Sequence, residues 1–166
     1  NEVAQRPAEA EVLPEQATLG QQRWLAPIGL GHTILALILY GICVAVARLM
    51  FRLKVVDRQV VPAEGPIVLT PNHSSYLDPI VRAASFGWRE LRNTYWVGWS
   101  RIMLAGPIMR AISRAANVLP IDPDRDPGAA LALAASALKT KDRLVWFPEG
   151  RRSPTGQVTE FLSGIA

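Results

Sequence analysis

The chain of 166 residues is long enough for one domain with a hydrophobic core, and a hydrophobic content of 49% is typical of a folded protein. Its formal charge is +4, but residues 1–23 hold four acidic and two basic side chains, so the rest of the chain carries a charge of +6. This positive charge indicates a membrane surface or a phosphorylated substrate as partner. The single cysteine, Cys43, excludes an intrachain disulfide and leaves too few ligands to predict a metal site. Nucleic acid is not expected as a partner, because no recognition-helix or zinc-finger pattern is present.

The N-terminal part of the chain divides into a polar arm and an apolar run. Residues 1–22 are polar and acidic without apolar periodicity, which is typical of a disordered arm or linker. Residues 24–47 contain no Asp, Glu, Lys or Arg, and a helix of this length, rising about 1.5 Å per residue, can cross a bilayer core of about 30 Å. We therefore expect a membrane-associated or transmembrane helix over residues 23–50, weakened at its start by Pro27 and Gly29. A helix in the membrane interface or in a protein core stays an alternative.

Basic residues are concentrated after this apolar run. Arg23 precedes the run, whereas four basic residues follow it: Arg48, Arg52, Lys54 and Arg58. By the positive-inside tendency, the body that follows the run is expected to face the cytoplasm. A secretory signal is disfavoured, because its positive charges would precede the apolar residues.

Short apolar runs then alternate with helical stretches in what we expect to be one domain over residues 51–166. The apolar runs are short enough for buried strands, at residues 66–70, 94–97, 117–121 and 144–147. Helices are expected between them at residues 79–86, 99–116 and 128–139, the last with Asp126 as its cap and Pro127 in its first turn. This alternation predicts an α/β fold with a mostly parallel sheet flanked by helices.

Polar residues follow three of the expected strands. In an open parallel sheet, ligands bind outside the carboxyl ends of the strands, so these residues are the candidates for a functional site. They are Asn72, His73 and Asp78 after the first run, Arg125 after the third, and Glu149, Gly150, Arg151 and Arg152 after the fourth. If the strands are parallel, these side chains converge on one edge of the sheet.

The pair formed by His73 and Asp78 has two interpretations. If a turn brings the side chains together, neutral His73 is able to take a proton from an alcohol while Asp78 fixes the tautomer of the ring. Alternatively, Asp78 followed by Pro79 is a good helix cap, and His73 is an uncommitted loop residue. A serine nucleophile at Ser74 or Ser75 would lack the glycine-flanked elbow that such serines occupy.

The run FPEGRRS, residues 147–153, also has two interpretations. Its proline, glycine and charges suit a solvated turn after a strand. Equally, Arg151 and Arg152 are able to place their planar guanidinium groups on phosphate oxygens, with Gly150 allowing close approach of the backbone.

Taken together, NHSSYLD and FPEGRRS resemble two signature blocks of the glycerolipid acyltransferase family, whose best-known members are the 1-acylglycerol-3-phosphate acyltransferases. The first matches the Asn-His-x4-Asp pattern of the family. The second differs at Arg151, which stands where threonine is usual, and keeps Arg152 at the position of the family's arginine. Two ordered motifs at this spacing are far more specific than either motif alone.

The sequence departs from the family pattern at two further points. NVLPIDPDR, residues 117–125, resembles the middle block, but Pro123 follows the Ile-Asp pair and Arg125 lies two positions later than the family's arginine. This displacement bears on the acceptor headgroup more than on the type of reaction. The family's last block, an apolar proline-containing strand, has no counterpart before Ala166, so we expect a C-terminally incomplete domain.

The resemblance implies roles for the candidate residues. His73 would act as the base on a lysolipid hydroxyl, Asp78 would orient His73, and the activated oxygen would attack an acyl thioester directly, without an acyl-enzyme. The resemblance also implies a site for a phosphate-bearing acceptor, and the candidates for it are Asn72, Arg125, Glu149, Gly150, Arg151 and Arg152.

We therefore expect a membrane-bound acyltransferase of phospholipid biosynthesis. It would move a fatty acyl group from a thioester of coenzyme A or acyl carrier protein to a lysophospholipid, with 1-acylglycerol-3-phosphate giving phosphatidic acid. No cofactor and no metal ion are expected. Two alternatives stay open: a non-catalytic lipid-binding or scaffolding segment with the same fold, and hydrolysis of the thioester by water. The arginines argue against hydrolysis, because water needs no phosphate-binding site.

Overall fold

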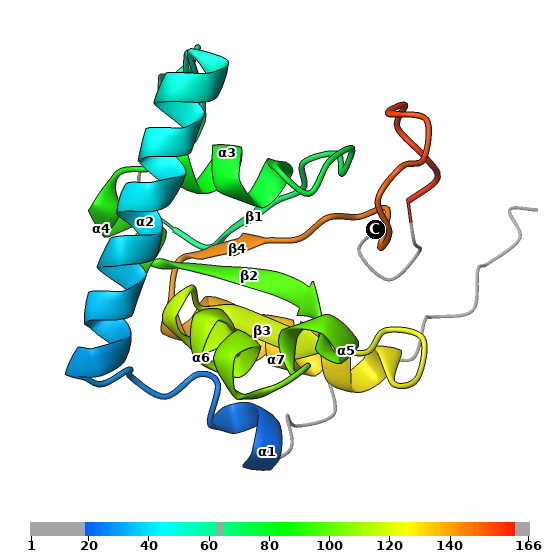
Figure 1. Cartoon of the computed structure of the whole chain (residues 1–166). Helices are drawn as coiled ribbons and strands as arrows, with labels where there is room; N and C mark the ends of the chain where they lie inside the picture. The colour runs from blue at the N-terminus through cyan, green and yellow to red at the C-terminus, as the bar shows by residue number, and fades with distance from the viewer. Residues whose placement is uncertain (1–18, 63–64, 162–166) are drawn as a thin grey trace, which may run out of the picture.

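The computed structural model describes residues 19–62 and 65–161, and Figure 1 shows their arrangement. The strands are β1 (Ile67–Leu69), β2 (Thr94–Trp99), β3 (Val118–Ile121) and β4 (Arg143–Val145). The helices are α1 (Leu19–Gln22), α2 (Leu30–Phe51), the 3-10 turn η1 (Arg58–Val60), α3 (Asp78–Ser85), α4 (Trp88–Arg92), α5 (Ser100–Met103), α6 (Pro107–Ala115) and α7 (Pro127–Thr140). The predicted arm lies outside the described residues except for its end, where α1 forms one helical turn.

The four strands form one parallel sheet in the order β1-β4-β2-β3. Leu144 of β4 pairs with Val68 of β1 on one side and with Tyr95 of β2 on the other. Each strand overlaps one of the short apolar runs, as expected for aliphatic and aromatic side chains on a buried pleated surface. The prediction of a mostly parallel α/β fold flanked by helices is confirmed.

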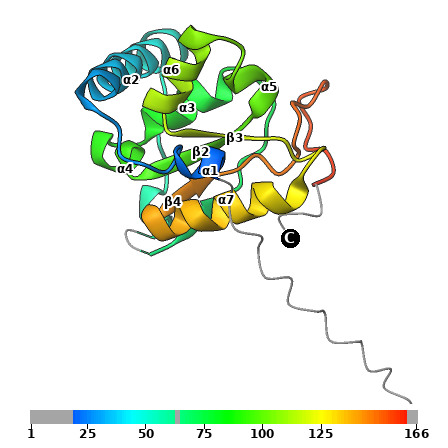
Figure 2. The same ribbon diagram turned by 90° about the horizontal axis from the view of Figure 1, so that it is seen from below.

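Helices cover both faces of the sheet (Figure 2). α7 lies on one face and starts as predicted, because the carboxylate of Asp126 accepts a hydrogen bond of 2.8 Å from the N–H of Ala129. Leu133 of α7 joins Leu119 of β3 and Leu144 of β4 in the main hydrophobic core. Full burial of such a leucine contributes about 1.5–3 kcal/mol, so this face stabilises the sheet that carries the candidate site. On the opposite face, α5 and α6 pack against β3, and α3 lies on this face toward the other end of the sheet.

The helical stretch predicted over residues 99–116 is two helices. Gly106 interrupts it with a φ of 139°, a backbone conformation that helices do not use and that favours glycine. Pro107 then begins α6, since proline fits the first turn of a helix. The short α4 and η1 were not predicted, because pieces of five and three residues are too short to show a helical periodicity.

The apolar run of residues 24–47 does not form one helix from its start, so the helix predicted over residues 23–50 begins too early. α2 starts only at Leu30, because Trp24 is buried in the core of the domain. The guanidinium group of Arg114 donates hydrogen bonds of 2.5 and 2.6 Å to the carbonyl oxygens of Trp24 and Ala26. These tertiary contacts, together with Pro27, hold the segment before α2 in an irregular conformation.

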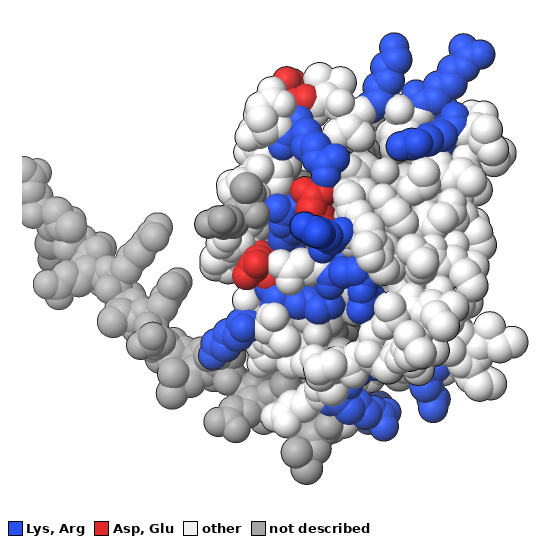
Figure 3. All heavy atoms as spheres, turned by 90° about the vertical axis from the view of Figure 1, so that its left-hand side faces the viewer, with Lys and Arg blue, Asp and Glu red and all other residues white. Residues whose placement is uncertain are grey.

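α2 packs along the body of the domain and exposes its other side. It contacts α3 and α6, and the hydroxyl of Tyr40, near its middle, donates a hydrogen bond of 3.0 Å to the carbonyl oxygen of Phe86. Within the described residues, α2 is the one helix that is long and apolar enough to cross a membrane, with a mean hydropathy of 2.4. Its exposed apolar side chains are Leu30, Ile34, Leu37, Ile38, Ile42, Leu49, Met50 and Phe51. Figure 3 shows a continuous uncharged surface on this side of the molecule, with basic side chains above and below it.

Candidate active site

The candidate site lies where β1 and β4 end. The two strands are neighbours and parallel, so the loops that follow them leave the same edge of the sheet, on the right in Figure 1. The β1 loop carries His73 and leads into α3, whereas the β4 loop carries Glu149. These two residues are 76 positions apart in the sequence, yet the main-chain N–H of His73 donates a hydrogen bond of 2.8 Å to Oε1 of Glu149.

His73 and Asp78 form a hydrogen-bonded pair. Nδ1 of His73 lies 2.9 Å from Oδ2 of Asp78, and each side chain is 20% exposed. Asp78 is the first residue of α3, but its carboxylate turns back toward the preceding loop and accepts the N–H groups of Ser74 and Ser75, both at 2.7 Å. The loop therefore folds around the carboxylate. Asp78 does not act as a helix cap but holds the loop before α3 in shape.

The surroundings of Asp78 keep its carboxylate ionised. Partial burial raises the pKa of Asp78, but the N–H groups of Ser75 and Ser74 and the imidazole of His73 outweigh this effect, so the pKa is below its usual value. An ionised carboxylate only accepts hydrogen bonds, so Nδ1 of neutral His73 carries the proton of this bond. The unprotonated Nε2 is then available as a base.

The ring and the main chain of His73 are fixed by the β4 loop. The imidazole stacks on the ring of Phe147, with the ring centres 4.3 Å apart. The carbonyl oxygen of His73 accepts a hydrogen bond of 2.8 Å from the N–H of Ser153, while its own N–H is bound to Glu149. Both polar groups of the His73 main chain are thus held by one loop.

Glu149 is buried, with 6% of its surface exposed, and its two oxygens have different partners. Oε1 accepts the N–H of His73, and Oε2 accepts both the N–H and the hydroxyl of Thr159, at 3.1 and 2.7 Å. The hydroxyl of Thr159, together with the main-chain N–H of His73, lowers the pKa of Glu149. Gly150 follows with a φ of 65°, and its N–H closes a turn on the carbonyl oxygen of Phe147 at 3.1 Å.

The predicted arginines lie around this centre on the surface. Arg152 places its guanidinium carbon 4.0 Å from the ring centre of Tyr76 in the β1 loop, and Arg151 pairs with Asp124 of the β3–α7 loop at 3.7 Å. Both interactions join loops from different strands. Asn72 and Arg125 are exposed, and among the described residues no hydrogen bond or ion pair of either side chain is seen.

Several contributors to this geometry were not predicted. The N–H groups of Ser74 and Ser75, the ring of Phe147, the N–H of Ser153 and the side chain of Thr159 all act on His73 directly or through a neighbour. Most of these contacts involve main-chain groups, which every residue type carries, so residue identity gives no signal for them. Thr159 carried no signal because it lies ten residues from Glu149 in an irregular segment.

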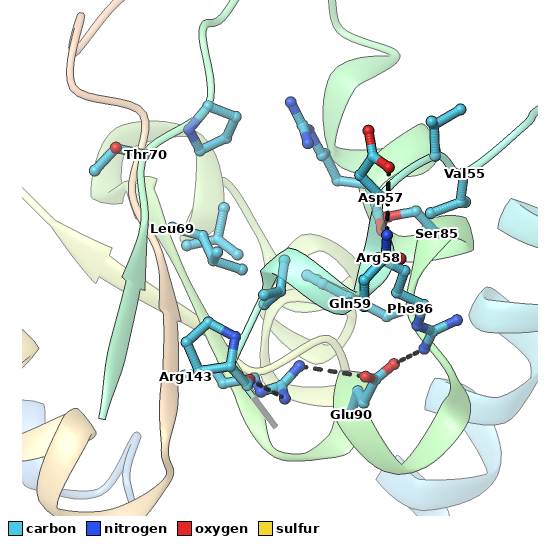
Figure 4. Close-up of a pocket in the computed structure, with 16 residues that line it drawn as sticks. Val55, Asp57, Arg58, Gln59, Leu69, Thr70, Ser85, Phe86, Glu90 and Arg143 are labelled. Atoms are coloured by element: carbon cyan, nitrogen blue, oxygen red, sulfur yellow. Dashed lines mark hydrogen bonds and ion pairs between the residues drawn. The ribbon is translucent and has the colours of Figure 1, made fainter. Parts of the chain in front are cut away.

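A cavity of about 860 Å³ lies on another part of the domain, between the α2–β1 connection and the end of α3 (Figure 4). Its lining reaches Pro71 but does not include His73. Glu90 in its wall forms ion pairs with Arg58 and with Arg143, the latter at 3.4 Å. These pairs tie α4 to β4 and to η1, so we assign them a structural role. In the described parts of the chain, no group of three His, Cys, Asp or Glu side chains is placed to hold a metal ion.

Comparison with known proteins supports the assignment of this site to an enzyme family. A family model described as Acyltransferase matches residues 52–166, a segment that contains all four strands and both loops of the candidate site. Comparison with solved structures gave no match. The matched segment is more than half of the chain and includes the two motifs that carry the resemblance, so the chain belongs to the acyltransferase family.

Proposed function

We propose that this protein transfers a fatty acyl group from an acyl thioester to the free hydroxyl of a lysophospholipid, with 1-acylglycerol-3-phosphate as the principal acceptor and phosphatidic acid as the product. The observation that carries this proposal is the 2.9 Å hydrogen bond between Nδ1 of His73 and Oδ2 of Asp78. It supports a base at Nε2 in a protein of the acyltransferase family.

The proposed reaction proceeds by direct attack. Nε2 of His73 takes the proton of the acceptor hydroxyl, and the oxygen attacks the carbonyl carbon of the thioester. The carbon–sulfur bond of the tetrahedral intermediate then breaks, and the departing thiolate takes the proton from Nε2. Asp78 stabilises the imidazolium between these two proton transfers and keeps Nε2 directed at the acceptor. A thioester is already activated for acyl transfer, so the proposal requires no cofactor and no metal ion.

Arginine side chains support a phosphorylated acceptor. Arg152 stacks over Tyr76, so its guanidinium group lies against the loop that also carries the proposed base, His73. Arg151 lies on the same edge of the sheet but is partly neutralised by Asp124. A planar guanidinium group can donate two parallel hydrogen bonds to two oxygens of one phosphate, and a phosphate monoester offers such oxygens. We propose that Arg152 makes the main contact with the acceptor phosphate and that Arg125 and Asn72 border the same site.

We also propose that α2 attaches the protein to the membrane. Its exposed apolar side chains would enter the lipid, and the basic residues that follow it would bind anionic headgroups on the cytoplasmic side. The packing of α2 favours an orientation along the membrane surface rather than across it. Tyr40, near the middle of the helix, is hydrogen-bonded to Phe86, and the charged residues Arg82, Arg89 and Glu90 lie within four positions of Phe86. A helix that crossed the bilayer would bring these charges to the membrane centre, at a cost of about 2.5–3.5 kcal/mol for each charge.

The experiment for the proposed function is acyl transfer by the detergent-solubilised protein from a long-chain acyl-coenzyme A to a panel of lysophospholipids that includes 1-acylglycerol-3-phosphate. His73→Ala is the test variant, and His32→Ala, which removes the other histidine of the chain, is the matched control. We expect phosphatidic acid from wild type and from the control, and none from His73→Ala. Free fatty acid without acylated lipid would instead indicate hydrolysis. Folded wild-type protein that binds lysolipid but forms no product with any acyl donor would indicate a non-catalytic lipid-binding segment.

A further inference from the structure

We infer that Glu149 and Thr159 are positioning residues that hold the main chain of His73, and that Glu149 does not itself bind the acceptor. This inference rests on the proposed role of His73 as the base. It assigns to Thr159 a function that the sequence motifs do not contain, and it changes the expected role of Glu149 from a contact with substrate to a contact with the catalytic loop.

The hydrogen bonds of Glu149 leave it little capacity for a substrate. Oε1 is occupied by the N–H of His73 at 2.8 Å, and Oε2 by the hydroxyl and the N–H of Thr159 at 2.7 and 3.1 Å. The residue is 6% exposed, so the carboxylate faces the protein rather than the open edge of the sheet. A buried carboxylate with three donors is stable only while these donors stay in place.

The geometry couples the end of the described chain to the base. Thr159 lies ten residues beyond Glu149, and its two hydrogen bonds fix the carboxylate from the side opposite His73. The carboxylate therefore bridges two segments: the irregular segment that contains Thr159 and the loop after β1 that contains His73. Because the imidazole already stacks on Phe147 and bonds to Asp78, holding the N–H of His73 removes the remaining freedom of that residue along its main chain.

The positioning role and an acceptor-binding role predict different kinetics. If Glu149 bound the acceptor, its removal would raise the KM for the lysophospholipid. If it positions His73, a small displacement of the base lowers kcat, because proton transfer depends on close alignment of the reacting atoms, whereas acceptor binding by the arginines is kept.

The test uses Thr159→Val, which keeps the shape and the main-chain N–H but removes the hydroxyl, and Thr159→Ser, which restores the hydroxyl. Thr159 is on the surface, so both variants are expected to fold. Steady-state kinetics with acyl-coenzyme A and 1-acylglycerol-3-phosphate are compared with those of Glu149→Gln, in which one carboxylate oxygen becomes a donor that opposes the N–H of Thr159. We expect kcat to fall by about 10- to 100-fold in Thr159→Val and Glu149→Gln, with the acceptor KM changed less than about twofold, and Thr159→Ser to restore kcat.

Amide hydrogen exchange of His73 gives a readout that does not depend on turnover. We expect its N–H to exchange about fivefold faster in Thr159→Val than in wild type, which corresponds to the loss of one hydrogen bond, and to return to the wild-type rate in Thr159→Ser. The inference is overturned if the variants raise the acceptor KM at unchanged kcat, or if Thr159→Val equals wild type in both kinetics and exchange. If wild type forms no acylated lipid but the His73 amide still responds to Thr159→Val, the bridge is retained and the proposed function is what fails.

Discussion

Oδ2 of Asp78 accepts Nδ1–H of His73 at 2.9 Å while it also accepts two main-chain N–H groups of the loop between them. The same oxygen thus fixes the shape of the loop and the tautomer of the ring. Separating these two effects requires a variant that keeps the shape of the side chain but loses its charge. Asparagine meets this requirement, because its carbonyl oxygen still accepts N–H groups.

We expect Asp78→Asn to keep the fold and to lower kcat by about 10²- to 10⁴-fold, because the imidazolium formed during the reaction loses its negative partner. The KM for the acceptor should change little. Steady-state kinetics check this result, with Asp57→Asn as the control, since Asp57 is an exposed aspartate outside the candidate site. Wild-type kcat in Asp78→Asn would show that His73 needs no anionic partner and would contradict the proposed mechanism.

Arg152 is expected to contribute to acceptor affinity rather than to chemistry. Replacing it with alanine removes the guanidinium group that lies over Tyr76, and we expect the KM for 1-acylglycerol-3-phosphate to rise by about 10- to 100-fold, the loss that corresponds to a charge-assisted hydrogen bond. The KM for a lysophospholipid without a terminal phosphate monoester should rise less. Arg89→Ala is the matched control, because Arg89 is an exposed arginine of α4. Equal effects of the two substitutions on KM would exclude a specific phosphate contact at Arg152.

The elements of this fold could be predicted well because their signals are local. The four strands are short apolar runs, and α7 begins at an Asp-Pro pair whose carboxylate forms the expected cap. The start of α2 could not be predicted in this way. Trp24 belongs by composition to the same apolar run as α2, but it is buried in the core and held there by Arg114, which lies 90 positions away in the sequence.

In the candidate site, too, local contacts could be predicted from the sequence and contacts between distant segments could not. The pairing of His73 with Asp78 follows from a five-residue spacing that a loop can close, so the sequence was sufficient to suggest it. The contact between Glu149 and His73 depends on the order of strands in the sheet and is made by a main-chain N–H, which no residue type reveals. Thr159 was missed for a further reason: a hydroxyl in an irregular segment becomes informative only when its partner is known.

Membrane binding is expected to depend on the exposed side of α2. Leu37 and Ile38 are 55% and 54% exposed, so replacing both with glutamate should leave the packed side of α2 intact and abolish flotation of the protein with lipid vesicles. Val158→Glu, at a valine that is 63% exposed far from α2 in the sequence, is the control and should float like wild type. Unchanged flotation of the Leu37→Glu/Ile38→Glu variant would exclude α2 as the attachment site.

The basic residues in the last turn of α2 and directly after it are expected to select anionic lipid. Replacing Arg48, Arg52 and Lys54 together with glutamine should weaken binding to anionic vesicles by about 100-fold, since each basic residue near a membrane surface contributes about 1 kcal/mol. Binding to zwitterionic vesicles should change little. Quantitative vesicle co-sedimentation at two salt concentrations checks this, because only the electrostatic part weakens with salt. Equal losses on both vesicle types would indicate damage to α2 rather than loss of charge recognition.

The orientation of α2 can be measured by the depth of labels along it. Single cysteines at Ile34, Ile42 and Leu49, each placed in a Cys43→Ser background, carry a fluorophore that lipid nitroxides quench. For a helix along the membrane surface, we expect similar depths at all three positions, because all three side chains are exposed on the body of the protein. A clearly deeper label at Ile42 than at both ends would show that α2 crosses the bilayer.

Lys141 is predicted to make stability depend on pH. Its ammonium group donates a hydrogen bond of 2.7 Å to the carbonyl oxygen of Arg92 and lies 4.3 Å from the ring centre of Tyr95. Burial and the positive charges of Arg92 and Arg114 nevertheless lower the pKa of Lys141 to about 7. An unfolded lysine has a pKa of about 10.4, so between pH 7 and 10 the unfolded state binds the extra proton, and stability rises with pH across this window.

We therefore expect the free energy of unfolding of wild type to rise from pH 7 to pH 9, with a slope below about 1.4 kcal/mol per pH unit, the limit for one proton. In Lys141→Met this slope should disappear, because no group at this position titrates. Denaturant unfolding at pH 7, 8 and 9 measures the slope, and Lys139→Met, at an exposed lysine in the last turn of α7 just before Lys141, should keep the wild-type value. If the free energy of unfolding varies with pH in the same way in wild type and in Lys141→Met, the ammonium stays charged in the folded protein throughout this range. The contacts of the ammonium with the Arg92 carbonyl and the Tyr95 ring would then outweigh its burial.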